Sequence, residues 1–496
     1  MEVNYGPGEL VMYDTIVLGS DMGSLVAAVT LANHGKKTIL LTDDAPQSYS
    51  ESGYTFDIDP LPWTGYNRGN AFKQFLSHLG IPQEDPVENP PLQIIFWKHR
   101  IELCGKVEPD LKEMKREFPD EVSRILRFYD SITKSSSFVS GLIDKGLHLR
   151  PETVGDYMNL FLNMPLIALK QRAFAAHLRN MQQEPQLRKT LGAQIRLLSH
   201  LDPHGISPIS HARTLSLSLN GLSRYRGGKH LLIERLKKKF EADGGVIEGR
   251  PISVLDIERV VKVTVQPQDA QGDAIPIIYG RNMILSTKHE QCTSLLEGNR
   301  ELSPLRKRYD KIHPSLYPFT LHLGVHDRCI PEKMGAYVVF VSEETGPVED
   351  GNTSFPETND LFLETSEPGD TLRAPDGKRA ISVTAFLKNS PLESPDGDLK
   401  TIAEGMLKNL APFLPFLEEG LDFMNVERSI YLSRSCQRTV SHKYAVKGPL
   451  IGMSFLPIKT PMKNLFLTGD MLIPGLGFEG EIMSGINAAR LAMGEN

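Results

Sequence analysis

Near its carboxyl end, the chain carries an apolar run that stops at Gly469-Asp470 and is followed by a glycine-rich loop. A strand that ends in Gly-Asp places a carboxylate at the edge of a sheet where ligands bind, and that carboxylate can accept hydrogen bonds from ligand hydroxyl groups. The loop contains Gly475, Gly477 and Gly480, and glycine lets backbone approach a flat ring closely. A helix expected to begin near Gly480 would aim its free N–H groups and positive dipole end at the same ligand. This segment therefore predicts a ligand-binding site at the carboxyl end of the strand.

A second candidate site is the loop Gly19-Ser20-Asp21-Met22-Gly23-Ser24, which lies where a G-x-G-x-x-G dinucleotide fingerprint would lie. Gly19 fits the first glycine, which makes the turn. Asp21 and Ser24 replace the second and third glycines, and Gly23 lies between them. Two unit charges about 4 Å apart cost roughly 4 kcal/mol at an effective dielectric constant near 20, so Asp21 would oppose a diphosphate. That cost largely disappears if Asp21 faces solvent or caps the following helix.

The acid that binds ribose hydroxyls in this fingerprint normally ends the second strand. Here Thr42 holds the expected position, and Asp43 and Asp44 follow it. Asp43 is therefore the candidate ribose ligand. The residues favour dinucleotide binding, with a βαβ unit that binds no nucleotide as the alternative. No nucleophile motif, P-loop or paired-carboxylate pattern stands out, so the sequence assigns no catalytic residue.

The loops lie in patterns typical of an α/β fold. Residues 15–18 and 38–41 are apolar strand patterns on either side of a helical pattern, which predicts a βαβ unit of about thirty residues. The carboxyl ends of its parallel strands should form a ligand crevice. Helical periodicity dominates residues 76–205, as in the segments 119–132, 157–178 and 187–198.

Together, these motifs resemble the phytoene desaturase and carotenoid isomerase branch of the FAD-dependent amine oxidase superfamily. The closing segment 464–489 is the most specific part of the resemblance. Gly53-Tyr54-Thr55-Phe56-Asp57, Tyr225-Arg226-Gly227-Gly228 and Gly244-Gly245-Val246-Ile247 lie in the family's order. The resemblance therefore spans the chain as separated anchors.

The resemblance implies an α/β fold with a Rossmann-like FAD-binding domain assembled from discontinuous segments, and an interleaved α+β substrate domain. The FAD-binding domain would comprise residues 1–75, 206–300 and 421–496. The substrate domain would comprise residues 76–205, mostly helical, and residues 301–420.

The same resemblance implies FAD as cofactor. Asp470 would contact the flavin chain, Gly53 would lie in a second nucleotide-side loop, and a strand around Val254 would run beside the adenine. The full set of candidate cofactor-binding residues is Gly19, Asp21, Gly23, Ser24, Asp43, Gly53, Val254, Gly469, Asp470, Gly475, Gly477 and Gly480.

The activity implied is hydride transfer between flavin and an apolar, isoprenoid or polyene, substrate, with desaturation, saturation and isomerisation all open. A flavin amine oxidase is an alternative, although the aromatic pair and flavin-facing lysine of that branch have no clear counterpart. A second alternative is a binding protein without flavin, similar to the Rab GDP-dissociation inhibitor. Asp21, Ser24 and Thr42 are changes expected if nucleotide affinity were lost, whereas the intact closing motif argues for the enzyme.

Composition narrows the partners. The 496 residues include 55 Lys and Arg against 61 Asp and Glu, a net charge of −6, so nucleic acid is not an expected partner. The four cysteines form no C-x-x-C pair, which favours a reducing cytoplasm. Neither a secretory signal nor a membrane-spanning run is apparent. We expect a cytoplasmic protein that binds an apolar small molecule, with peripheral membrane contact open and the oligomeric state not predicted.

Two further patterns have ordinary interpretations. His322 and His326 have the spacing of helical metal ligands but lie in a strand pattern, so no metal site is predicted. The apolar stretch 160–169 is favoured as a core helix. A tunnel wall or a membrane-facing patch is the alternative.

Overall fold

The computed structural model describes most of the chain. The described residues are 12–43, 45–64, 71–81, 90–96, 99–104, 106–144, 154–202, 208–219, 222–266, 277–341, 360–445 and 456–494.

A seven-stranded sheet collects strands from distant parts of the chain in the order β7-β2-β1-β10-β9-β8, with β17 also paired to β10. The strands are β1 (Met12–Leu18), β2 (Thr38–Leu41), β7 (Val246–Glu248), β8 (Ile252–Ile257), β9 (Val261–Val265), β10 (Ile277–Ser286) and β17 (Leu465–Thr468). The pairs that join β7, β2, β1, β10 and β17 are all parallel, whereas β9 and β8 extend the sheet antiparallel. The predicted βαβ unit is confirmed, and the parallel strands end together at one edge.

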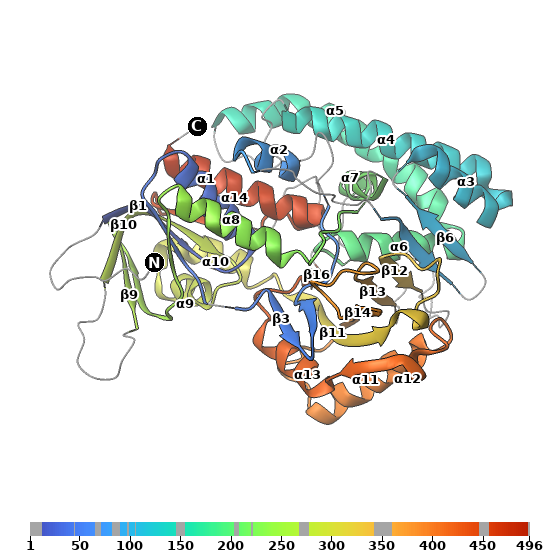
Figure 1. The fold of residues 1–496 in the computed structure, drawn as a ribbon. Coiled ribbons are helices and arrows are strands. Elements are labelled where there is room, and N and C mark those ends of the chain that lie inside the picture. Colours follow the sequence, from blue (N-terminus) through green and yellow to red (C-terminus); the bar gives the residue numbers. More distant parts are fainter. Residues whose placement is uncertain are drawn as a thin grey trace.

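Helices α1 (Met22–Asn33), α14 (Gly477–Met493) and α8 (His230–Ala242) lie next to one another beside this sheet (Figure 1). Glycine makes the closest contact possible, because a Cβ atom added to Gly485 of α14 would lie 2.3 Å from the Gly23 carbonyl oxygen of α1. Side chains of ordinary size would hold the helices apart. The helix of the first motif and the helix of the closing motif are therefore directly packed.

A second sheet has eight strands in the order β15-β11-β14-β13-β12-β5-β6, with β16 also paired to β11. Its strands are β5 (Leu92–Ile95), β6 (Arg100–Leu103), β11 (Pro314–His326), β12 (Tyr337–Phe340), β13 (Leu361–Thr365), β14 (Lys378–Leu387), β15 (Leu421–Met424) and β16 (Lys443–Tyr444). A separate hairpin joins β3 (Ser48–Glu51) to β4 (Tyr54–Asp57).

Two strands after the predicted boundary at residue 421 pair with the second sheet. β15 and β16 lie within the segment assigned to the FAD-binding domain, yet both pair with β11 of the second sheet. β15 pairs with residues 323–325 along the edge of β11 opposite β14, and β16 pairs with residues 314 and 316, before the stretch of β11 that pairs with β14. The division into two domains otherwise stays a prediction.

The predicted helical region is confirmed, with the β5–β6 pair added to it. It contains α2 (Ala71–His78), α3 (Val107–Glu117), α4 (Val122–Asp144), α5 (Val154–Gln182) and α6 (Pro185–Leu198), and α7 (Pro208–Leu219) follows. The remaining helices are α9 (Glu290–Gly298), α10 (Ser303–Tyr309), α11 (Asp396–Leu410), α12 (Leu417–Gly420) and α13 (Val426–Ser435).

The favoured core interpretation of residues 160–169 is wrong for most of the described side chains. Among the described residues of α5, the side chains buried in the core are Ile167 and, in the C-terminal half, Phe174, Leu178 and Met181. In the N-terminal half, seven large apolar side chains are 44–82% exposed: Val154, Tyr157, Met158, Phe161, Leu162, Leu166 and Leu169. They recur three or four positions apart, so they form one face of the helix. Among the described residues, no helix is long and apolar enough to cross a bilayer.

Candidate functional site

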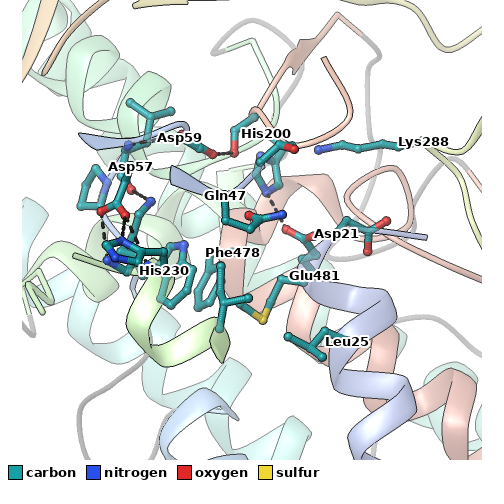
Figure 2. A pocket seen from close by; sticks show the side chains of 18 of the residues that line it. Asp21, Leu25, Gln47, Asp57, Asp59, His200, His230, Lys288, Phe478 and Glu481 are labelled. Atoms are coloured by element: carbon teal, nitrogen blue, oxygen red, sulfur yellow. Dashed lines mark hydrogen bonds and ion pairs between the residues drawn. The ribbon is translucent and has the colours of Figure 1, made fainter. Parts of the chain in front are cut away.

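A pocket opens where the parallel strands of the first sheet end (Figure 2). Asp21, Lys288 and Glu481 lie at one end of it, and Asp57 and His230 lie at the other. The free space is about 70 Å³, room for a few water molecules at roughly 10–15 Å³ each and too little for a dinucleotide. The lining residues are Ser20, Asp21, Met22, Leu25, Gln47, Asp57, Asp59, Leu61, Pro62, Trp63, Leu197, Leu198, Ser199, His200, Lys229, His230, Ile233, Lys288, Thr439, Ser441, Lys443, Phe478 and Glu481.

Asp21 caps helix α1. Its Oδ1 accepts a hydrogen bond from the Ser24 N–H at 2.8 Å, and its Oδ2 accepts one from the Ser286 hydroxyl. The side chain is 7% exposed. The capping alternative is therefore confirmed, and one backbone N–H group at the start of α1 is already bound to a carboxylate.

Glu481 brings a second carboxylate to the same helix end. It lies in the second turn of α14, and its Oε1 accepts a hydrogen bond from the Gly23 N–H at 3.3 Å. Burial raises the pKa of Glu481 to about 8; the charges of Asp21 and Asp470 add to the rise, and the Lys288 ammonium opposes it. Two carboxyl groups of the chain thus occupy the N–H groups that a diphosphate would need.

Asp470 lies at the carboxyl end of β17, as the sequence predicts, and is fully buried. Lys288 Nζ lies 2.9 Å from its Oδ2, and the Tyr444 hydroxyl lies 3.2 Å from each carboxylate oxygen. Burial raises the pKa of Asp470, whereas the Lys288 charge opposes that rise. The contact of Asp470 with ribityl hydroxyls stays a prediction, because in this structure its partners are a lysine and a tyrosine of the chain.

Asp43 follows the second strand and also has partners within the chain. It accepts a hydrogen bond from the Ser20 hydroxyl, and Arg438 binds its other oxygen at 2.6 Å. Arg438 in turn binds Glu290 at 2.7 Å. Burial would raise the pKa of Asp43, but the contacts with Ser20 and Arg438 outweigh it, so the pKa is lowered. A ribose hydroxyl would have to compete with these groups, and this role for Asp43 also stays a prediction.

The glycines of both motifs approach protein atoms closely. Gly19 adopts a φ of +152°, and a Cβ there would lie 2.4 Å from the Ser24 hydroxyl oxygen. In the closing loop, a Cβ on Gly477 would lie 2.0 Å from the Leu198 carbonyl oxygen, and one on Gly480 would lie 2.2 Å from the Ile473 carbonyl oxygen. The closing glycines thus fit the loop against α6 and against itself. Their approach to a flat ring stays a prediction.

The other candidate residues lie at varied distances from the pocket. Gly469 and Gly475 neighbour Thr287 and Ser210. Gly53 makes the turn between β3 and β4, where it faces Pro375, outside the pocket lining. Val254 belongs to β8, the edge strand on the far side of β9 and β10 from β1. The structure therefore places Gly53 outside the pocket lining, and the position of Val254 beside an adenine stays a prediction.

Sequence reasoning missed several pocket residues. Asp57 caps α8 by accepting hydrogen bonds from the Lys229 N–H at 2.9 Å and from the His230 N–H at 3.3 Å. Burial would raise its pKa, but the hydrogen bond from His230 and nearby positive charges lower it to about 2. Both segments were recognised as family anchors, so their meeting at one helix end was the available signal.

No sequence motif pointed to His200 or Lys443. His200 follows helix α6 and Lys443 lies in the short strand β16, so the two residues are far apart in the chain. Lys443 Nζ donates to the Ser199 carbonyl oxygen at 2.6 Å, and burial lowers the pKa of Lys443 to about 7. His200 is 5% exposed, and both of its ring nitrogens lack a hydrogen bond within the described residues. Burial and the charge of Lys443 lower the pKa of His200, so its ring is neutral near pH 7.

The histidines of β11 do not form a metal site. His322 packs against Tyr49 and Phe56, with ring centroids 5.1 and 4.9 Å away. Within the described residues, no group of three or more His, Cys, Asp or Glu side chains is arranged to hold a metal ion.

Solved structures of similar fold include an oxidoreductase, a putrescine oxidase and a Rab GDI. An oxidoreductase from Methanosarcina mazei is 14% identical with a TM-score of 0.59, covering 96% of this chain and 99% of its own. Putrescine oxidase bound to putrescine is 13% identical with a TM-score of 0.57, covering 97% and 99%. The Rab GDI of Plasmodium falciparum is 11% identical with a TM-score of 0.52, covering 98% of both chains. The chain thus has the fold of the FAD-dependent amine oxidase superfamily.

Sequence comparison narrows this resemblance to one branch. The prolycopene isomerase of Arabidopsis thaliana is 22% identical over 509 residues, covering 96% of this chain and 82% of that protein. The prolycopene isomerase of Daucus carota is 23% identical over 515 residues, covering 98% and 80%. No family model matches the chain. The resemblance to the carotenoid isomerase branch is confirmed over nearly the whole chain.

The residues at the start of α1 could bind a diphosphate, but not in the arrangement that the structure shows. In favour are the start of α1, the Lys288 ammonium and the unpartnered ring nitrogens of His200. Against it are the Glu481 carboxyl group on the Gly23 N–H and the small free space. A diphosphate therefore fits only after Glu481 has left Gly23 and carries no charge, because a second anion beside it would be strongly repelled.

Proposed function

We propose that this chain is an FAD-dependent enzyme that isomerises, oxidises or reduces an apolar polyene. The observation that carries the proposal is that the opening and closing motifs, which are remote in sequence, line one pocket at the carboxyl ends of parallel strands. Similarity to prolycopene isomerases along 96–98% of the chain supports the same class of substrate. When bound, the flavin would supply the redox chemistry, and the chain would bind and orient the substrate.

The apolar part of the pocket supports a substrate with few polar groups. Trp63 and Phe478 stack with ring centroids 4.5 Å apart and an interplanar angle of 10°, and Leu61, Leu197 and Leu198 lie in the same lining. Such a surface recognises shape and apolar area. Lys443, whose pKa is about 7, is the lining group best suited to hold or release a proton near neutral pH.

The exposed apolar face of α5 supports delivery of this substrate from a lipid surface. Seven large apolar side chains on one side of a helix are costly in water. An interfacial helix buries such a face among lipid headgroups without crossing the bilayer. We propose that α5 docks on a membrane surface, where a polyene would be dissolved.

A second candidate function is supported by a specific observation. The carboxyl groups of Asp21 and Glu481 occupy the start of α1, and a Rab GDI shares the fold. A protein of this kind would bind an apolar ligand or a protein partner without flavin.

The flavin content of the purified protein decides between the two functions. Near one flavin per chain, released by denaturation and measured from its visible absorption, supports the enzyme. The enzyme should then convert a cis-polyene, followed by chromatography of the products. A colourless protein that takes up no added FAD refutes the enzyme and favours the binding protein.

A further inference from the structure

The start of helix α1 is held by carboxyl groups from two places in the chain. Asp21 accepts from the Ser24 N–H, and Glu481, which is 458 positions from Gly23, accepts from the Gly23 N–H at 3.3 Å. The first contact is an ordinary cap made by the preceding residue. The second requires a buried side chain from another helix, and it has no role in capping α14 itself.

The neighbouring acid on α14 shows that this placement is specific. Glu479 is bound by Arg213, with Nε at 2.9 Å and Nη2 at 2.5 Å from its two oxygens. Its charge is therefore compensated away from α1. Glu481 has no comparable bidentate partner among the described residues and lines the pocket instead.

Charged and titratable groups reach Glu481 from every element packed around it. Asp21 precedes α1, His200 follows α6 with Nε2 at 3.9 Å from Oε2, Lys288 follows β10, and Asp470 follows β17. Two residues of β16 also contribute: the charge of Lys443 lowers the pKa of His200, and the Tyr444 hydroxyl donates a hydrogen bond to Asp470. The Lys288 ammonium acts on three acids here, Asp21, Asp470 and Glu481, and it is 2.9 Å from Asp470.

This arrangement already contains a group that imitates an anionic ligand. A diphosphate at the start of α1 would take the Gly23 N–H, where the Glu481 oxygen now lies. The His200 ring is buried and directed into the pocket, and neither of its nitrogens has a hydrogen bond among the described residues, so it offers a further donor to such a ligand. Both observations point to an anion-binding site that is closed by a side chain of the protein.

We propose that Glu481 is an internal competitor for the diphosphate of the cofactor, and that the cofactor binds only while the Glu481 carboxyl group is protonated and has left Gly23. This inference rests on the proposed FAD-dependent function and adds the residue that regulates access to its site. Because the pKa of Glu481 is about 8 before binding, the wild-type protein would bind FAD well at pH 7 and progressively less well above pH 8. Proton linkage gives about a tenfold rise in Kd from pH 7 to pH 9.

The experiment is an FAD titration of the purified apoprotein between pH 6.5 and pH 9, followed by flavin fluorescence. The variants are Glu481→Gln, which keeps the shape without the charge, and Glu481→Ala, which removes the competing group. Glu427→Gln is the matched control, because it removes the same charge from an 81% exposed side chain outside the pocket. Calorimetry in two buffers of different ionisation enthalpy measures proton uptake directly.

We expect the Kd of Glu481→Gln to be independent of pH and about tenfold lower than that of wild type at pH 9. Glu481→Ala should bind at least as tightly, and Glu427→Gln should follow wild type. Uptake of a proton by wild type but not by Glu481→Gln supports the proposal. Equal Kd values for wild type and both variants across this range overturn it while leaving the FAD-dependent function intact. Absence of FAD binding in every variant, wild type included, overturns both.

Discussion

Replacing Glu479 by alanine should destabilise the protein strongly. Glu479 and Arg213 form a bidentate pair in which the side chains are 1% and 3% exposed. Removing one partner of a buried pair leaves the other charge without compensation, which costs about 3–5 kcal/mol. The loss should appear in the free energy of unfolding, measured by denaturant titration at pH 7 with circular dichroism.

The matched comparison is the double variant Glu479→Leu with Arg213→Met, which removes both charges and keeps much of the volume. Replacement of a whole buried pair by apolar groups is often close to neutral, so the double variant should be more stable than Glu479→Ala. A loss below about 1 kcal/mol in Glu479→Ala would refute the reasoning. So would a double variant that is no more stable than the single one.

Three further predictions concern other parts of the molecule. Burial raises the folded-state pKa of Glu481 to about 8 from an ordinary 4.5, so its contribution to stability is present below pH 4.5 and is lost as pH rises towards 8. Glu481→Gln should lack this loss of about 1.4 kcal/mol per pH unit. Thermal melting that shows the same pH dependence in both proteins would contradict this prediction. Gly477→Ala should lower the melting temperature, because residue 477 has a φ of +54° and its Cβ would lie 2.0 Å from a carbonyl oxygen. Gly397→Ala, which places no atom within 4 Å of its Cβ, should not lower it. Equal melting temperatures for the two variants would contradict this prediction. Phe161→Asp on α5 should weaken co-sedimentation with phosphatidylcholine vesicles, and Leu392→Asp, a control that is 62% exposed elsewhere, should leave it unchanged; equal sedimentation of all three proteins would argue against docking.

The sequence predicted the scaffold well because it rests on local patterns. The strands 15–18 and 38–41 and the helix that follows β17 were recognised from apolar periodicity and glycine positions, which act over a few residues. Their parallel pairing follows from the handedness of the connection. The capping of α1 by Asp21 was one of two positions that the sequence left open for this side chain, since a cap depends on the first turn alone.

The chemistry of the pocket was harder to predict because it depends on contacts between distant segments. Nothing near residue 481 indicates that its side chain reaches Gly23, and nothing near residue 288 indicates that its ammonium lies beside Asp470. The exposure of α5 was predicted only as the alternative to a core helix, for a related reason. A run of apolar residues predicts that a helix face is buried away from water, but it does not indicate whether protein or lipid covers that face.

The dependence of α1 on α14 has a consequence for how the protein is made. The Gly23 amide finds its partner only after Glu481 has been synthesised, 458 positions later. Strand β17, which completes one edge of β10, is equally late. During translation, part of the first sheet and one face of α1 therefore stay uncovered until the carboxyl-terminal residues have been synthesised. Premature termination before residue 465 would remove β17 and α14. Such a fragment should be a preferred target for chaperones and proteases.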